Sequence, residues 1–124
     1  MSAKYKRMLE QSAPHRLKGM RKAWGLTQNQ LAVLLIGKSR SLISRVERAQ
    51  ACPCTHIVIA STILFGRSVE HLFKGLYDAV EEHVLREAYT LEEKLSGDDR
   101  PVAKRKRELL AGVIQRIVER HRQK

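Results

Sequence analysis

The sequence of 124 residues has no long hydrophobic run and only two cysteines. No apolar stretch approaches the roughly 20 residues that a membrane-spanning helix needs, and the first ten residues lack the hydrophobic segment of a secretion signal. We therefore expect a cytoplasmic protein that does not enter a membrane. Cys52 and Cys54 are too few and too close together for a disulfide framework, which also favours a reducing compartment.

Acidic residues are scarce in the first part of the chain. Residues 1–75 contain 13 Lys and Arg and 3 Asp and Glu, residues 76–99 contain 2 and 8, and residues 100–124 contain 9 and 2. The net charge of +11 and the isoelectric point near 10.2 suit a polyanionic partner. Charge alone leaves DNA, RNA and an anionic membrane surface open as that partner.

Motifs of enzymes and metal sites are also missing. The first part of the chain has no paired carboxylates and no glycine-rich phosphate loop, and the five histidines show no ligand spacing. Cys52, Cys54 and His56 form a Cys-x-Cys-x-His pattern that is compatible with metal or redox chemistry. Because no second ligand pair exists, and because Pro53 and Thr55 suit a loop at a helix start, we expect neither a metal nor a cofactor, and no catalysis.

Residues 26–48 carry the clearest structural pattern. Thr27 followed by Gln30 is a capping box, which predicts a helix that begins near Gln28. Gly37 predicts a sharp turn at the other end, because glycine adopts the left-handed conformation at little cost. The residues of this helix that we expect to face inward are Leu31, Ala32, Leu34 and Leu35.

A second helix is predicted after the turn, with Ser39 as its N-cap. Ile43 and Val46 lie three residues apart and are expected to face inward. The outer face then holds only small polar and basic residues, namely Arg40, Ser41, Ser44, Arg45 and Arg48. Two short helices with such an outer face are typical of proteins that place a helix in the major groove of DNA.

These residues resemble the lambda-repressor-like, Cro/Xre-type helix-turn-helix family. Its pattern is Arg, a six-residue gap, Gln, two residues, Leu-Ala, and a Ser-rich helix that ends in Arg-hydrophobic-Glu-Arg. The corresponding residues here are Arg21, Gln28, Leu31, Ala32, Arg45, Val46, Glu47 and Arg48. The resemblance covers residues 15–76. Two features depart from it: Ala49 stands where the family often has Gly, and the segment between Ala32 and Ser39 is one residue longer than in most members.

The resemblance implies roles for individual residues. Arg21 and Glu47 would form a salt bridge inside the domain. Phosphate contacts would come from Gln28, Lys38 and Ser39. Base edges would be faced by Arg40, Ser41, Ser44 and Arg45, with Arg48 on the same surface. An arginine that binds O6 and N7 of guanine contributes roughly 1–3 kcal/mol of discrimination, and we expect this of Arg40 and Arg45.

Three further helices complete the predicted domain. One begins near Ser12 and Pro14 and ends at Gly25, with Leu17, Met20 and Trp24 on its apolar face. The next covers residues 56–65, with Ile57, Ala60, Ile63 and Leu64 inward and Gly66 as its end. A short fifth helix contains Val69, Leu72 and Phe73. β-Propensity alone would also allow a strand at residues 57–65, but the helical surroundings argue against it.

Residues 76–124 predict two amphipathic helices joined by a turn at residues 96–101. We expect this hairpin to mediate self-association, although it also fits a layer on a monomer. The expected interface residues are Val84, Leu91, Leu109, Val113 and Ile117. The basic cluster at residues 104–107 would lie along flanking phosphates or in solvent, and residues 1–11 would form a basic arm that contacts DNA or frays.

The sequence therefore predicts an all-α protein with three parts: a basic arm at residues 1–11, a five-helix lambda-repressor-like DNA-binding domain at 12–75, and a helical extension at 76–124. The expected function is sequence-specific DNA binding by a dimeric transcriptional regulator, a repressor on a palindromic operator. One alternative is an antitoxin-like autoregulator whose hairpin binds a partner protein. Another is charge-driven binding of nucleic acid with little dependence on sequence.

Overall fold

The computed structural model describes residue 3, residues 15–37 and residues 39–123. Within these residues helix is the only regular secondary structure, which confirms the predicted all-α class. The helices are α2 (His15–Ala23), α3 (Gln28–Ile36), α4 (Ser41–Glu47), α5 (Thr55–Phe65), α6 (Val69–Leu72), α7 (Lys74–Lys94) and α8 (Pro101–Arg122). None of these helices is long and apolar enough to cross a membrane. Three of the predicted features lie outside the described residues: the helix start at Ser12 and Pro14, the phosphate contact Lys38, and all of the basic arm except residue 3.

The chain divides into two compact units, Met1–Ala79 and Val80–Lys124, which we call unit 1 and unit 2. The division falls four residues after the boundary that the sequence predicted. Helix α7 (Lys74–Lys94) contributes residues to both units.

Local capping explains where α3 begins and ends. The hydroxyl of Thr27 accepts a hydrogen bond from the backbone N–H of Gln30 at 3.0 Å, and the Gln30 side chain accepts one from the Thr27 N–H at 3.0 Å. The predicted capping box is therefore present. At the other end, Gly37 has φ +65° and its N–H donates to the carbonyls of Ala32 and Val33. This left-handed residue ends the helix as predicted.

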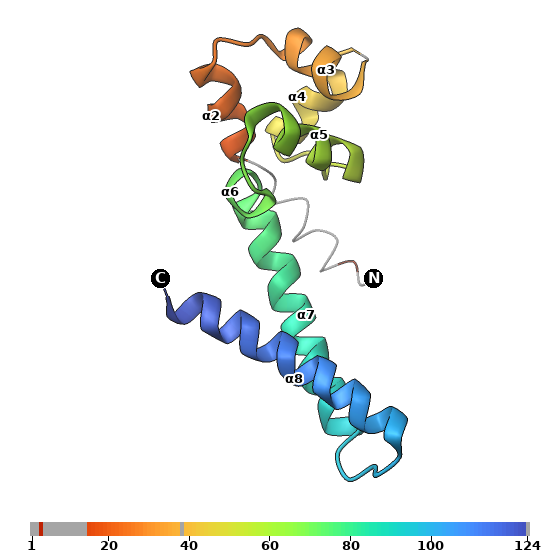
Figure 1. The fold of residues 1–124 in the computed structure, drawn as a ribbon. Helices are drawn as coiled ribbons and strands as arrows, with labels where there is room; N and C mark the ends of the chain where they lie inside the picture. Colours follow the sequence, from red (N-terminus) through yellow and green to blue (C-terminus); the bar gives the residue numbers. More distant parts are fainter. Residues whose placement is uncertain (1–2, 4–14, 38, 124) are drawn as a thin grey trace. The chain divides into compact units, whose positions relative to one another are not determined.

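The core of unit 1 lies between short helices that cross one another. Helix α3 packs against α4 and α5, α2 packs against α4 and α6, and α5 packs against α6 (Figure 1). The fully or almost fully buried residues are Leu17, Leu31, Ala32, Leu35, Ile43, Val46, Ile57, Leu72 and Phe73. Each of the five helices α2 to α6 supplies at least one of these residues, and Phe73 directly follows α6. Unit 1 therefore has a single shared core.

Four residues that were expected to face inward are exposed. Leu34 of α3 is 53% exposed, and Ile63 and Leu64 of α5 are 77% and 37% exposed. Trp24 follows the last residue of α2 and is 70% exposed. In α3 the buried residues are Leu31, Ala32 and Leu35, and in α5 they are Ile57 and Ser61. Both helices are apolar around most of their circumference, and unit 1 has too few elements to cover every side of them.

In unit 2, the helices begin and end close to the predicted residues. Gly97 has φ +81° after the end of α7, and Pro101 is the first residue of α8, where its fixed φ suits a helix start. Between them Asp98 accepts hydrogen bonds from the backbone and guanidinium of Arg100, at 3.0 Å to the N–H and 2.6 Å to Nη2. These contacts fix the turn that reverses the chain.

Candidate nucleic-acid interface

Helix α4 presents the basic outer face that the sequence predicted. Ile43 and Val46 are fully buried and hold the helix against the core. On the opposite side the exposed residues are Arg40, Ser41, Arg45 and Arg48, while Ser44 is half-buried. The only acidic side chain of α4, Glu47, is buried. The outward surface of this helix therefore carries positive charge without a carboxylate.

The predicted N-cap of this helix is wrong. Helix α4 begins at Ser41, its N-cap is Arg40 with no capping side chain, and Ser39 lies before it. The Ser39 hydroxyl instead lies 3.1 Å from the Ser41 hydroxyl. The N-cap is therefore Arg40 and not Ser39, so the helix starts one residue later than predicted. Arg40 consequently precedes the first helical residue.

A buried ion pair fixes α4 to α2. The Arg21 Nε donates to Glu47 Oε2 at 2.8 Å and its Nη2 donates to Oε1 at 3.0 Å. The two side chains are 10% and 1% exposed. Arg21 Nη1 also donates to the Leu26 carbonyl at 2.9 Å. The structure thus brings together the two residues that the resemblance paired, and both oxygens of the carboxylate accept hydrogen bonds, as a buried charge requires.

Gln28 adds a contact that sequence reasoning missed. Its Nε2 donates to Glu47 Oε1 at 3.1 Å, so the side chain that was predicted to bind a phosphate is joined to the ion pair. The backbone N–H of Gln28 is at the first position of α3, where helical N–H groups have no carbonyl partner within the helix. This N–H and the positive end of the helix dipole provide the anion-binding capacity at this position. Gln28 and Glu47 are 19 residues apart in the sequence, so no local spacing signalled this contact.

The end of α4 contains a left-handed alanine. Ala49 has φ +61°, and it is the one residue other than glycine with positive φ in the described part of the chain. Its N–H donates to the Val46 carbonyl at 3.1 Å and the Gln50 N–H donates to the Arg45 carbonyl at 2.8 Å. This pair of bonds is a Schellman motif, in which glycine is the favoured residue at the left-handed position. The departure from the family pattern at Ala49 therefore has a conformational cost.

The chemistry available on this surface is that of polyanion binding. Arg40, Arg45 and Arg48 each offer a planar guanidinium with several donors, and serine hydroxyls lie between them. Arg48 Nε makes one contact within the helix, to the Ser44 carbonyl at 3.3 Å. Lys38, the remaining predicted contact, lies outside the described residues.

The predicted interface residues of unit 2 differ in exposure. Val84 and Leu91 of α7 are 42% and 43% exposed, and Leu109 of α8 is 65% exposed. Val113 and Ile117 are half-buried. All five are apolar residues with accessible surface in the isolated chain.

A charged cluster joins α7 to α8 within unit 2. Arg120 donates to both carboxylate oxygens of Glu81, at 2.7 Å from Nε and 2.6 Å from Nη2, and His121 Nε2 lies 2.7 Å from Oε1. The hydrogen bond from Arg120 holds the pKa of Glu81 below its ordinary value, His121 contributes in the same direction, and burial partly opposes both. The ionised carboxylate therefore stabilises the helix pair.

The basic cluster at residues 104–107 is divided between two roles. Arg107 is half-buried, and its Nη1 donates to the carbonyls of Leu95 and Asp98, so it closes the turn. Lys104, Arg105 and Lys106 are exposed. Only these three have side chains that are accessible to a polyanion.

The residues considered for metal binding do not converge. Cys52 and Cys54 are exposed and not in a disulfide. Cys54 is the N-cap of α5, in the loop that the sequence predicted there. Among the described residues no group of three His, Cys, Asp or Glu is arranged to hold a metal ion.

Comparison with known proteins finds no match: no family model fits the chain, and neither a curated protein nor a solved structure is significantly similar to it. The resemblance to the helix-turn-helix family thus rests on the motif residues alone.

Proposed function

We propose that this chain is a sequence-specific DNA-binding transcriptional regulator of the lambda-repressor-like, Cro/Xre type, a repressor that binds a palindromic operator as a dimer. The observation that carries the proposal is the acid-free basic face of α4, held outward by two fully buried residues, Ile43 and Val46. In this proposal helices α2 to α6 form the DNA-binding domain, α3 and α4 form the helix-turn-helix, and α7 and α8 form the C-terminal hairpin.

The buried ion pair supports the same function. A carboxylate on the outer face of α4 would repel phosphates, and Glu47 is the only acid between Glu10 and Glu70. Its pairing with Arg21 at 2.8 Å removes that repulsion and also holds the angle of α4 relative to α2. The basic charge of the surface is therefore available to a polyanion without compensation.

Within the proposal, Arg40 and Arg45 bind base edges in the major groove, together with Ser41 and Ser44. Phosphates are bound by the Gln28 backbone, Lys38, Ser39 and Arg48. An arginine that binds O6 and N7 of one guanine uses both donors of its planar fork, whereas a phosphate accepts any positive charge. This difference separates base contacts from phosphate contacts experimentally.

The test compares Arg45→Ala with Arg45→Lys on a duplex obtained by selection from random oligonucleotides and on a scrambled duplex. If Arg45 binds a guanine, both variants lose about 1–3 kcal/mol of affinity for the selected site, and Arg45→Lys keeps its affinity for the scrambled duplex. Fluorescence anisotropy at a fixed salt concentration measures the affinity of each variant for each duplex. Full recovery of site affinity by lysine would assign Arg45 to a phosphate.

Dimerisation is part of the proposal because one recognition helix contacts only a few base pairs. Two copies on a twofold axis bind half-sites about one helical turn, roughly 34 Å, apart. The exposed Val84, Leu91 and Leu109 and the half-buried Val113 and Ile117 supply apolar surface that such an association can bury.

The same exposed surface favours a second candidate function, an antitoxin-like autoregulator that binds a partner protein through α7 and α8. Leu109 is the most exposed of these apolar residues, at 65%. A stoichiometric partner that co-purifies with the full chain and is lost with Leu109→Glu would support this function. Retention of the partner by Leu109→Glu would count against α8 as its binding site.

A further inference from the structure

Unit 1 has a second exposed surface, and this one carries no charge. It consists of apolar side chains from the end of α2, from α3 and from α5, and we call it the apolar patch: Trp24, Val33, Leu34, Ile59, Ile63 and Leu64. Their exposed fractions range from 37% for Leu64 to 77% for Ile63. None of the six belongs to the residues to which the proposed function assigns a DNA contact.

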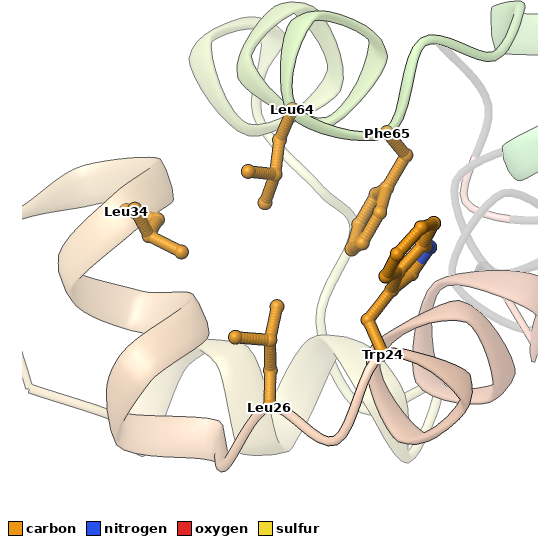
Figure 2. Close-up of a pocket in the computed structure, with 5 residues that line it drawn as sticks. All are labelled: Trp24, Leu26, Leu34, Leu64 and Phe65. Carbon is orange, nitrogen blue, oxygen red and sulfur yellow. The ribbon is translucent and has the colours of Figure 1, made fainter.

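The apolar patch has a hollow at its centre. A cavity of about 290 Å³ is lined by Trp24, Leu26, Leu34, Leu64 and Phe65. In Figure 2, Leu34 of α3 lies on one side of it, Trp24 and Phe65 lie on the other, and Leu64 and Leu26 lie between them. A second hollow shares Leu26 and Leu34 with the first and extends to Val33. The two hollows join the α3 and α5 parts of the patch into one continuous surface.

The size of the patch is that of a protein interface. With exposed fractions of 70% for Trp24, 65% for Val33 and 77% for Ile63, the six side chains expose on the order of 600–700 Å². A standard interface takes about 800 Å² from each partner, whereas the largest apolar patch of a typical monomer is about 300–600 Å². The patch therefore provides most of one side of a stable interface.

The shape and charge of the patch identify its partner. A twofold contact requires that one surface carry both the projecting groups and the hollow that receives them. Here Trp24, which is 70% exposed, lines a hollow together with Leu34 and Leu64, and Ile63, which is 77% exposed, directly precedes Leu64 on α5. Helices α3 and α5 contain no Asp, Glu, Lys or Arg, so these two helices bring no such like charges together when two copies of the patch meet.

We propose that a second copy of this chain covers the apolar patch, in a twofold contact in which each copy inserts apolar side chains into the hollow of the other. This contact on α3 and α5 of unit 1 replaces the apolar residues of α7 and α8 as the dimer contact of the proposed function on which it rests, and α7 and α8 remain available to a partner protein. Self-association of the full chain without DNA tests this contact, so its failure is separate from any failure of DNA binding.

Trp24 makes the contact directly measurable. It is the only tryptophan of the chain and it is 70% exposed. If the patch associates, Trp24 emission shifts to shorter wavelength as protein concentration rises, over the same range in which sedimentation velocity detects the dimer. Association through α7 and α8 leaves Trp24 in water, and its emission then does not change with concentration.

Ile63→Glu is the matching variant, because a side chain that is 77% exposed contributes little to folding and its replacement leaves the unit intact. It places a carboxylate within the apolar patch and raises the dimer Kd by at least about tenfold. Val33→Glu on α3, at a residue that is 65% exposed, has the same effect. The control is Val102→Glu, at an apolar residue of α8 that is 52% exposed and has no assigned contact, which leaves the dimer Kd unchanged.

Three results overturn the proposal. The first is a chain that stays monomeric at every concentration. The second is a dimer that forms with no change in Trp24 emission. The third is a dimer that is weakened by Leu109→Glu and not by Ile63→Glu or Val33→Glu. Far-UV circular dichroism establishes whether each variant keeps its helix content. If only one of Ile63→Glu and Val33→Glu is folded, the dimer Kd of that variant decides between the two outcomes.

Discussion

Replacement of Arg21 by alanine should destabilise unit 1 strongly. The change removes three hydrogen bonds, two of them to Glu47 at 2.8 and 3.0 Å and one to the Leu26 carbonyl at 2.9 Å. Glu47, whose side chain is 1% exposed, then keeps only the Gln28 amide as a donor. Removal of one partner from a buried ion pair typically costs about 3–5 kcal/mol, because the remaining charge is left without compensation. We expect Arg21→Ala to lie in this range.

The assay is urea unfolding followed by Trp24 emission, which reports on unit 1 because the chain has no other tryptophan. For a small domain with a slope of about 1–1.5 kcal/mol/M, a loss of 3 kcal/mol lowers the unfolding midpoint by about 2 M or more. Arg45→Ala is the matched control: it removes an exposed arginine of α4 and should change the free energy of unfolding by less than about 0.5 kcal/mol.

A double variant separates the energy of the Arg21–Glu47 ion pair from the packing energy of the two side chains. In Arg21→Met with Glu47→Leu, no charge remains buried and the side-chain volumes are similar, so the double variant should lose far less stability than either single change. The reasoning would be refuted if Arg21→Ala cost less than about 1 kcal/mol, or if the double variant lost as much as the sum of the two single changes.

Two further predictions follow from the backbone and from the charges of unit 2. Ala49→Gly should raise the free energy of unfolding of unit 1 by about 0.5–1 kcal/mol, because φ at this residue is +61°. Ala51→Gly is the control and should give no gain, because φ at Ala51 is not positive. Thermal unfolding followed by Trp24 emission measures the stability of both variants. Glu81, whose folded-state pKa is lowered, stabilises the helix pair fully above the ordinary carboxyl value of 4.5, and this contribution disappears as pH falls through the folded pKa. Amide hydrogen exchange of α8 at pH 6 and pH 3 should therefore show a larger loss of protection in the wild type than in Glu81→Gln, and equal losses would assign the pH dependence to other groups.

The predictions that depended on local chemistry were the most accurate. The capping box at Thr27 and the left-handed glycine at Gly37 place the ends of α3 because the partners of the backbone groups lie within five residues. The predicted start of α4 was wrong because no such local contact marks it. Its N-cap residue, Arg40, offers no capping side chain, so the boundary depends on the length of the preceding turn and not on a local signal.

Burial could not be predicted where a helix is apolar on several sides. Periodicity assigned Leu34 and Ile63 to the core, yet the packing of α3 against α5 covers Leu31 and Ile57 and leaves the other two exposed. Ser61 of α5 is fully buried instead, because its hydroxyl donates to the Ile57 carbonyl at 2.7 Å and needs no water. The sequence therefore identified every residue of the apolar patch as apolar but could not predict that these residues are exposed.

Selection of binding sites from random duplexes with the purified full chain measures whether α4 contacts base edges, as we propose. We expect enrichment of an inverted repeat whose half-sites are centred about one helical turn apart. We also expect Arg40→Ala to lose about 1–3 kcal/mol of affinity for that site and little for scrambled DNA. Recovery of no motif, with an affinity for DNA that depends on salt concentration and not on sequence, would show that α4 does not recognise base edges.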